Sequence, residues 1–146
     1  MIGISSCLCG INCKYSGKNN LNPIFLEILN KGEAIPICPE QLGGLPTPRI
    51  PAEIQKDKKG KIKVITKNNT DVTKEYFLGA ERALKILKAL EIDTVILKSK
   101  SPSCGYGKIY DGTFSKNLIE GNGITVDLLL KNNIKVINDE DYIKNK

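Results

Sequence analysis

Cysteine is the residue type in this chain best suited to chemistry, and histidine is missing: the 146 residues include five cysteines and no histidine. The absence of histidine excludes Ser–His–Asp and Cys–His machinery and any zinc site with an imidazole ligand. Cys7, Cys9 and Cys13 share one glycine-containing loop. Their spacings match neither the paired C-x₂-C of a zinc ribbon nor a ferredoxin run. Lone buried cysteines usually pack as small hydrophobes, but three in one loop favour metal binding.

The other two cysteines lie beside groups that can handle protons. Cys38 is followed two residues later by Glu40, and a glutamate is the natural proton carrier in a chain without histidine. Cys104 lies in Ser101–Gly107, which brings hydroxyls, a thiol and glycine backbone together. The ordinary alternatives are a solvated loop acid for the first segment and a Ser/Pro/Gly turn for the second.

The elements that must position these residues alternate between strand-like and helix-like patterns. Predicted strands are Ile2–Ser6, Ala34–Ile37, Lys61–Thr66, Thr94–Leu97 and Ile134–Ile137, and predicted helices run from Asn22-Pro23 to about Gly32, from Thr73 to Leu90 and from Gly123 to Asn132. This alternation predicts a single α/β domain over residues 1–146, with a mainly parallel, Rossmann-like sheet flanked by helices. Phe77, Ala80, Leu84 and Leu87 predict the apolar stripe of the longest helix. The prolines and glycines of Cys38–Pro51 predict a long functional loop without regular structure.

Three of the predicted strands lead into loops that contain cysteine. Cys7 follows the first strand, Cys38 follows the second, and Cys104 follows Thr94–Leu97. Ligands of parallel α/β sheets bind outside the carboxyl ends of the strands, and these ends share one edge of the sheet. The topology therefore predicts that three cysteines far apart in sequence meet in one pocket.

The net charge and the hydrophobicity pattern of the chain limit the partners that we expect. The net charge is +6, but Arg49 and Arg82 are the only arginines among 22 basic residues. Sequence-specific nucleic-acid readers depend on the arginine fork, so we expect no specific nucleic-acid partner and only a mild attraction for phosphate-bearing molecules. Neither a leader nor a membrane-spanning run is visible, so we expect a soluble, cytoplasmic protein without a membrane partner. In that compartment cysteines more often signify metal or redox chemistry than disulfides. The oligomeric state is not predicted.

Eight segments carry a more specific resemblance. They are Ile4–Leu8 and Cys13–Gly17, Ile37–Arg49 and Pro51–Glu53, Asp71–Thr73 and Phe77–Ala80, and Lys100–Gly105 and Ile109–Gly112. In these segments the chain resembles the thiouracil desulfidase family. The likeness covers nearly the whole chain, and the motifs around Cys38 and Cys104 are long and specific.

The resemblance implies a [4Fe–4S] cluster held by only three cysteines, Cys7, Cys38 and Cys104, so that one iron has no protein ligand. It implies non-redox desulfuration of 4-thiouracil, 4-thiouridine or its monophosphate to uracil or uridine plus hydrogen sulfide. The substrate's sulfur would bind the open iron, in the Lewis-acid role that zinc plays toward a carbonyl. Glu40 is then the expected general base, and Ser101 is expected to position the water or donate to the substrate. The implied partner is a small-molecule thiolated nucleobase or nucleotide.

Four further residues are candidates for substrate binding: Arg49, Glu53, Ser103 and Tyr106. Arg49 could hold a nucleotide phosphate. The alternative for Arg49 is a surface ion pair with Glu53, which would contribute little to stability.

The chain departs from the family's pattern at two positions. Cys9 stands where the family usually has an apolar residue, and Ser16 stands where aspartate is common. Cys9 and Cys13 are therefore spare thiols, for which we expect a structural role before that of a substitute ligand or a sulfur carrier. A fourth ligand would close the cluster, so the open iron requires that both thiols stay off it. Two functional alternatives stay open: a sulfide or iron–sulfur carrier without hydrolytic turnover, and a redox sensor that uses Cys9 and Cys13.

Overall fold

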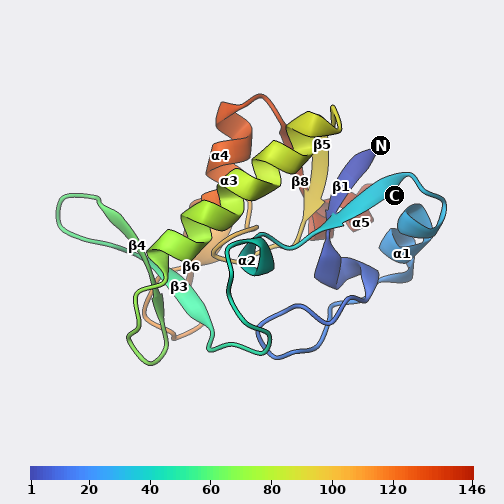
Figure 1. Cartoon of the computed structure of the whole chain (residues 1–146). Helices are drawn as coiled ribbons and strands as arrows, with labels where there is room; N and C mark the ends of the chain where they lie inside the picture. The colour runs from blue at the N-terminus through green and yellow to red at the C-terminus, as the bar shows by residue number, and fades with distance from the viewer.

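A four-stranded parallel sheet with the order β2-β1-β5-β8 forms the centre of the protein (Figure 1). The structure is a computed structural model that describes residues 1–146. In chain order its elements are β1 (Ile2–Ser5), the 3₁₀ helix η1 (Ser6–Cys9), α1 (Pro23–Asn30), β2 (Ala34–Ile37), α2 (Pro39–Leu42), β3 (Ala52–Lys56), β4 (Ile62–Thr66), α3 (Thr73–Ala89), β5 (Thr94–Leu97), β6 (Lys108–Tyr110), β7 (Leu118–Glu120), α4 (Ile124–Lys131), β8 (Lys135–Asn138) and α5 (Asp139–Lys144). The predicted single α/β domain with a parallel sheet flanked by helices is confirmed.

Helices cover both faces of this sheet. Successive strand side chains point to opposite faces, so Val95 of β5 packs into a cluster with Leu87 of α3 and residues of α4. The next residue, Ile96, packs into a second cluster with Phe25 of α1. Figure 1 shows α3 and α4 on one side of the strands and α1 and α5 on the other. Cys104 belongs to the first cluster and Cys7 to the second, so the cysteine-bearing end of the sheet joins both layers.

Two sequence predictions are wrong in ways that matter for the site. The segment Cys38–Pro51 contains the short helix α2, because Pro39 occupies its first turn, where the missing N–H costs nothing. The predicted strand at Lys61–Thr66 is present as β4, and it pairs with β3 in an antiparallel hairpin outside the parallel sheet. The apolar stripe of α3 is buried at Ala80 and Leu87 as predicted, but Tyr76 and not Phe77 belongs to it: Phe77 is 46% exposed, whereas Tyr76 is 3% exposed. The pair β6–β7 and the helices η1 and α5 were not predicted.

Two glycines let α2 lie directly on α3. A Cβ atom added to Gly43 would lie 2.0 Å from the carbonyl oxygen of Glu75, and one added to Gly79 would lie 1.9 Å from the carbonyl oxygen of Pro39. These distances are far inside van der Waals contact, so both positions require glycine at this packing distance. The contact brings the residue after Pro39, Glu40, next to the buried face of α3.

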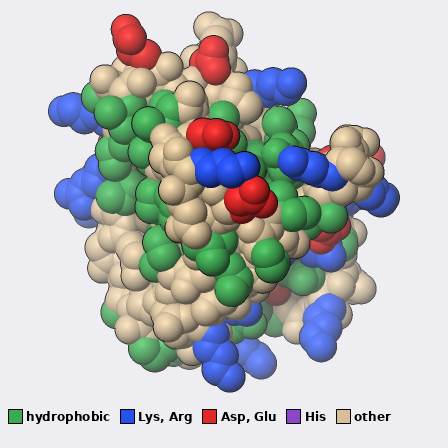
Figure 2. All heavy atoms as spheres, turned by 90° about the vertical axis from the view of Figure 1, so that its right-hand side faces the viewer, with side chains coloured by type: hydrophobic (Ala, Val, Ile, Leu, Met, Phe, Trp, Pro, Cys, Tyr) green, Lys and Arg blue, Asp and Glu red, His purple; other side chains and the backbone are tan.

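The face that carries α1 and the chain termini has a mixed surface. Figure 2 shows basic, acidic and apolar side chains interspersed on it. Glu27 of α1 and Lys31, which directly follows this helix, form an exposed ion pair of 2.9 Å, of a kind that contributes little to stability. The positive net charge is therefore not gathered into one patch on this face. No helix of the structure has the length and apolar character needed to cross a membrane.

The close approach of α2 and α3 predicts the effect of one added methyl group. Gly79→Ala should lower the free energy of unfolding by about 2 kcal/mol or more, because the methyl group overlaps the Pro39 carbonyl. Helix propensity alone predicts the opposite change in the free energy of unfolding, because it favours alanine over glycine by about 1 kcal/mol. Lys85→Ala, at an exposed position of the same helix, should change stability by less than about 0.5 kcal/mol. Urea unfolding of both variants measures the difference, and a stabilised Gly79→Ala would contradict the packing.

Candidate functional site

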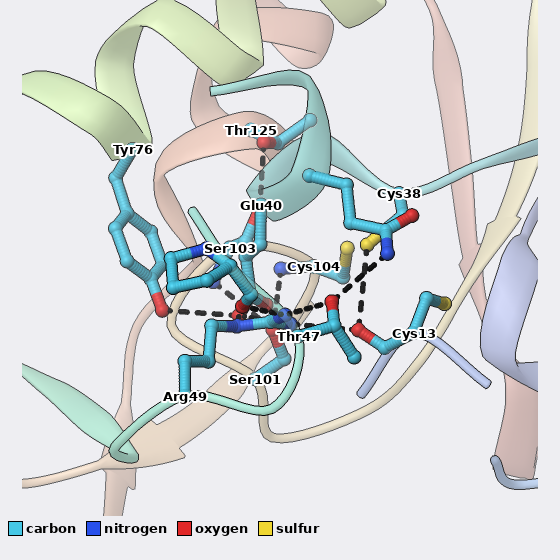
Figure 3. A network of polar contacts seen from close by, with 12 residues as sticks. Cys13, Cys38, Glu40, Thr47, Arg49, Tyr76, Ser101, Ser103, Cys104 and Thr125 are labelled. Carbon is cyan, nitrogen blue, oxygen red and sulfur yellow. Dashed lines mark hydrogen bonds and ion pairs between the residues drawn. The ribbon is translucent and has the colours of Figure 1, made fainter. Parts of the chain in front are cut away.

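The cysteine-bearing ends of three adjacent strands lie at one edge of the sheet, as predicted. Cys7 is in η1 directly after β1, Cys38 directly follows β2, and Cys104 lies in the turn after β5. Burial raises the pKa of the Cys104 thiol, and the nearby charges of Glu40, Cys38 and Cys7 raise it further. These mutual effects indicate that the three thiols lie near one another. Figure 3 shows Cys38 and Cys104 gathered with Cys13 beside Glu40.

Cys13 lies against two of these cysteines. Hydrogen bonding with the Cys13 thiol lowers the pKa of Cys7, and it lowers the pKa of Cys38 to about 7. The same hydrogen bonds, to Cys38 and to Cys7, raise the pKa of Cys13 itself. The Sγ atom of Cys38 also lies 3.9 Å from the carbonyl oxygen of Cys13. Cys7 and Cys38 are thus in surroundings that favour the thiolate, which is the form that binds metal.

The turn that carries Cys104 is held by Ser101 and by the start of α4. The Ser101 hydroxyl oxygen accepts hydrogen bonds from the backbone N–H groups of Ser103, at 3.0 Å, and Cys104, at 2.9 Å. The first N–H groups of α4 donate to this turn, Ile124 to the Pro102 carbonyl at 2.9 Å and Thr125 to the Ser103 carbonyl at 3.0 Å. These donors have no partner within their own helix. Because the Ser101 oxygen is the acceptor in both contacts, its proton is free to be donated.

Arg49 binds Glu40 and the loop of Cys13 at the same time. Its Nε atom donates to Glu40 Oε2 at 2.9 Å, and its Nη2 atom lies 2.8 Å from that oxygen. Nη2 also donates to the Cys13 carbonyl at 2.9 Å, and Nη1 donates to the Pro46 carbonyl and the Thr47 hydroxyl, each at 3.2 Å. The Arg49 side chain is 6% exposed. All three of its nitrogens have protein partners, so the geometry favours a positioning role over the binding of a phosphate.

The other candidate residues have different surroundings. The Glu53 carboxylate accepts hydrogen bonds from the N–H groups of Gly112 and Phe114, at 2.9 and 3.1 Å, and forms no ion pair with Arg49. The Ser103 hydroxyl is buried and bonds the Thr125 hydroxyl at 2.8 Å. Tyr106 is 38% exposed. Of the four substrate-binding candidates, Tyr106 is the one whose side chain is substantially open to solvent.

Cys9 points away from this site. Its Sγ atom lies 3.9 Å from the carbonyl oxygen of Phe25 in α1, and burial raises its pKa. These contacts support the structural role expected for Cys9. Cys13, for which the same role was expected first, instead lies beside Cys7 and Cys38. The loop that contains Cys9 and Cys13 has no helical or strand periodicity, so the sequence does not predict which of the two thiols faces the site.

Sequence reasoning also missed Tyr76. Its hydroxyl donates to Glu40 Oε2 at 3.2 Å, and its ring is buried on α3 (Figure 3). One signal was available, since a tyrosine on the buried face of a helix normally has a partner for its hydroxyl. The predicted stripe through Phe77 hid that signal.

Comparison with known proteins identifies the family of this chain. A family model described as 2-thiouracil desulfurase matches residues 2–141. The chain belongs to this family. The uncharacterized protein YbbK of Bacillus subtilis (strain 168) is 41% identical over 146 residues, covering 97% of each chain. A solved structure of the [4Fe-4S]-dependent thiouracil desulfidase TudS is 37% identical, with a TM-score of 0.87, and the match covers 98% of this chain and 93% of that chain.

The thiols of this 2-thiouracil desulfurase family member do not suit a single metal ion. No three cysteine, aspartate or glutamate side chains converge closely enough to hold one ion. Thiols that lie near one another without converging on one point suit a polynuclear centre instead, because each thiolate of such a centre binds a different metal atom. Thiolates are the ligands that iron–sulfur clusters require. The donor set of Cys7, Cys38 and Cys104 therefore fits an iron–sulfur cluster better than a mononuclear site.

The two arginines of the chain make a matched pair for testing the buried ion pair. Arg49→Lys should lower the free energy of unfolding by about 2 kcal/mol or more, because lysine keeps the charge but cannot reproduce the fork that joins Glu40, Cys13 and the Pro46 loop. Arg82→Lys should cost less than about 1 kcal/mol, because the Arg82 guanidinium is exposed and makes one hydrogen bond, to Leu42. Denaturant unfolding compares the variants. Equal losses would show that the Arg49 network does not stabilise the fold.

Proposed function

We propose that this protein is a desulfidase that hydrolyses a thiolated pyrimidine: 4-thiouracil, 4-thiouridine or its monophosphate. The products would be uracil or uridine and hydrogen sulfide. Family membership and the likeness to a thiouracil desulfidase support the substrate class. The observation that carries the proposal is the position of Glu40, a carboxylate two residues from Cys38 that Arg49 and Tyr76 hold in place at the cysteine-bearing edge of the sheet.

The cofactor in this proposal is a [4Fe–4S] cluster held by Cys7, Cys38 and Cys104. Three protein thiolates for four irons would leave one iron free of protein ligands. When bound, the cluster would supply a Lewis-acidic iron for the substrate's sulfur. The lowered pKa values of Cys7 and Cys38 support these two as thiolate ligands. The name of the TudS neighbour, which is [4Fe-4S]-dependent, supports the cluster type.

Glu40 and Ser101 carry the proton chemistry of the proposal. Hydrogen bonds and the ion pair of Glu40 all involve Oε2, so Oε1 is the oxygen that can accept a proton from an attacking water. The Ser101 hydroxyl, whose oxygen already accepts two N–H groups, can donate its proton to the water or to the pyrimidine. Water adds to the thiocarbonyl carbon, the carbon–sulfur bond breaks, and sulfur leaves as sulfide. No electrons are gained or lost in this exchange of sulfur for oxygen.

The substrate in this proposal is a small molecule. Tyr106 is the candidate best placed to contact a pyrimidine, because its aromatic side chain is 38% exposed in the loop of Cys104. The Arg49, Glu53 and Ser103 side chains already have protein partners. We place the protein in the cytoplasm, since all five cysteines are unpaired and a reducing compartment preserves them.

Iron content tests which thiols are ligands. Cys7→Ser, Cys38→Ser and Cys104→Ser should each reduce the iron bound per chain after anaerobic reconstitution to near background, because a serine hydroxyl is a poor ligand for soft iron. Cys9→Ser is the matched control and should keep wild-type iron, because the new hydroxyl can donate to the Phe25 carbonyl. Cys13→Ser should keep four irons per chain. Loss of iron from Cys13→Ser would make Cys13 a ligand and would contradict the open iron.

Sulfide release tests the role of Glu40. Glu40→Gln should reduce turnover of 4-thiouracil or its nucleotide, per loaded cluster, by about 100-fold or more, because the amide cannot accept the proton. Glu81→Gln, an exposed glutamate of α3, should leave turnover unchanged. Unchanged turnover in Glu40→Gln would remove the hydrolytic mechanism. Binding of sulfide without catalytic release by the wild type would favour the carrier protein instead.

A further inference from the structure

The carboxylate of Glu40 is held through one oxygen only. Oε2 accepts from Arg49 Nε at 2.9 Å and from the Tyr76 hydroxyl at 3.2 Å, and Arg49 Nη2 lies 2.8 Å away. Oε1 has no hydrogen bond or ion pair. The only fully buried side-chain oxygen or nitrogen without a partner in the protein is Glu75 Oε2, so Glu40 Oε1 keeps some access to solvent in a side chain that is 16% exposed. The two oxygens of this carboxylate are thus in different surroundings.

Tyr76 is the contact that fixes the rotation of the carboxylate. Arg49 approaches from the loop that follows α2, whereas Tyr76 approaches from α3. A side-chain carboxylate has a broad terminal torsion, so contacts from one direction alone leave its rotation poorly determined. Donors from two different elements on the same oxygen restrict the rotation and keep Oε1 turned away from both.

The rest of α3 holds the tyrosine rigidly. Its ring is 3% exposed and packs in the cluster that contains Ile54, Val64 and Ala80. The close contact of Gly43 with α3 sets the distance between α2 and α3, and so the distance between the hydroxyl and Glu40. Burial raises the pKa of Tyr76, so its hydroxyl stays protonated and acts as a donor. The ring has no freedom to leave the carboxylate without disturbing this packing.

We propose that Tyr76 is a positioning residue for the reaction: with Arg49 it holds Oε2 of Glu40, so that Oε1 alone faces the attacking water. This inference rests on the proposed desulfidase function and adds to it a residue that does not touch the substrate. Accurate placement of a proton acceptor increases turnover more than it strengthens substrate binding, because its alignment with the water matters most in the transition state. The hydroxyl of Tyr76 therefore acts on kcat rather than on KM.

Tyr76→Phe removes the hydroxyl and keeps the ring that packs in the core. In the reconstituted protein we expect wild-type iron content, a fall in kcat per loaded cluster of about tenfold or more, and a KM for 4-thiouracil within about twofold of wild type. Tyr142→Phe is the matched control. Tyr142 packs on Phe25 with ring centroids 5.6 Å apart and its hydroxyl has no hydrogen bond, so this variant should leave iron content, kcat and KM unchanged.

A crystal structure of Tyr76→Phe gives a readout that does not depend on turnover. We expect the Glu40 carboxylate to rotate or to occupy more than one orientation, while Cys38 and Arg49 keep their positions. An unmoved carboxylate, or a kcat per loaded cluster equal to that of the wild type, would overturn the positioning role. If the wild type releases no sulfide, the proposed function fails, and the crystallographic comparison still decides whether Tyr76 orients Glu40.

Discussion

Parallel pairing of β1 with both β2 and β5 is the constraint on which the site depends. Because the three strands run in the same direction, their carboxyl ends meet at one edge, and the residues that follow them are neighbours in space. Reversing either neighbour would move its cysteine to the opposite edge of the sheet. This pairing brings the segments that carry Cys7, Cys38 and Cys104 to one edge, although Cys104 lies 97 positions after Cys7 in the sequence.

A second set of contacts fixes what surrounds the thiols. Arg49 joins Glu40 to the Cys13 loop from a buried position, and α4 donates its first N–H groups to the turn of Cys104. The glycine contact between α2 and α3 completes the set, because it lets Tyr76 reach the same carboxylate. The hydrogen bonds of this set satisfy buried polar groups, and they and the glycine contact restrict the positions of a cysteine or of Glu40. Stability and site geometry therefore depend on the same residues.

The sequence predicts those parts of the fold whose signals are local. The strands of the parallel sheet and the helices α1, α3 and α4 have clear local patterns, and α1 also has a side-chain cap, because Asn22 accepts a hydrogen bond from the N–H of Ile24. The partners of Arg49 and Tyr76 are tertiary. Whether Tyr76 or Phe77 faces the core is decided by the glycine contact with α2, and both residues are aromatic, so pattern alone does not separate them. The family resemblance indicated the candidate ligands and Glu40 as site residues. It did not indicate which side chains hold these residues in position.

The proposed chemistry depends on an open iron, which would follow from three thiolate ligands for four irons. An anaerobic crystal structure of the reconstituted protein tests it most directly. We predict a four-iron cluster with Cys7, Cys38 and Cys104 on three irons and no protein atom on the fourth. A two-iron centre, or a fourth protein ligand such as Cys13, would contradict the proposal.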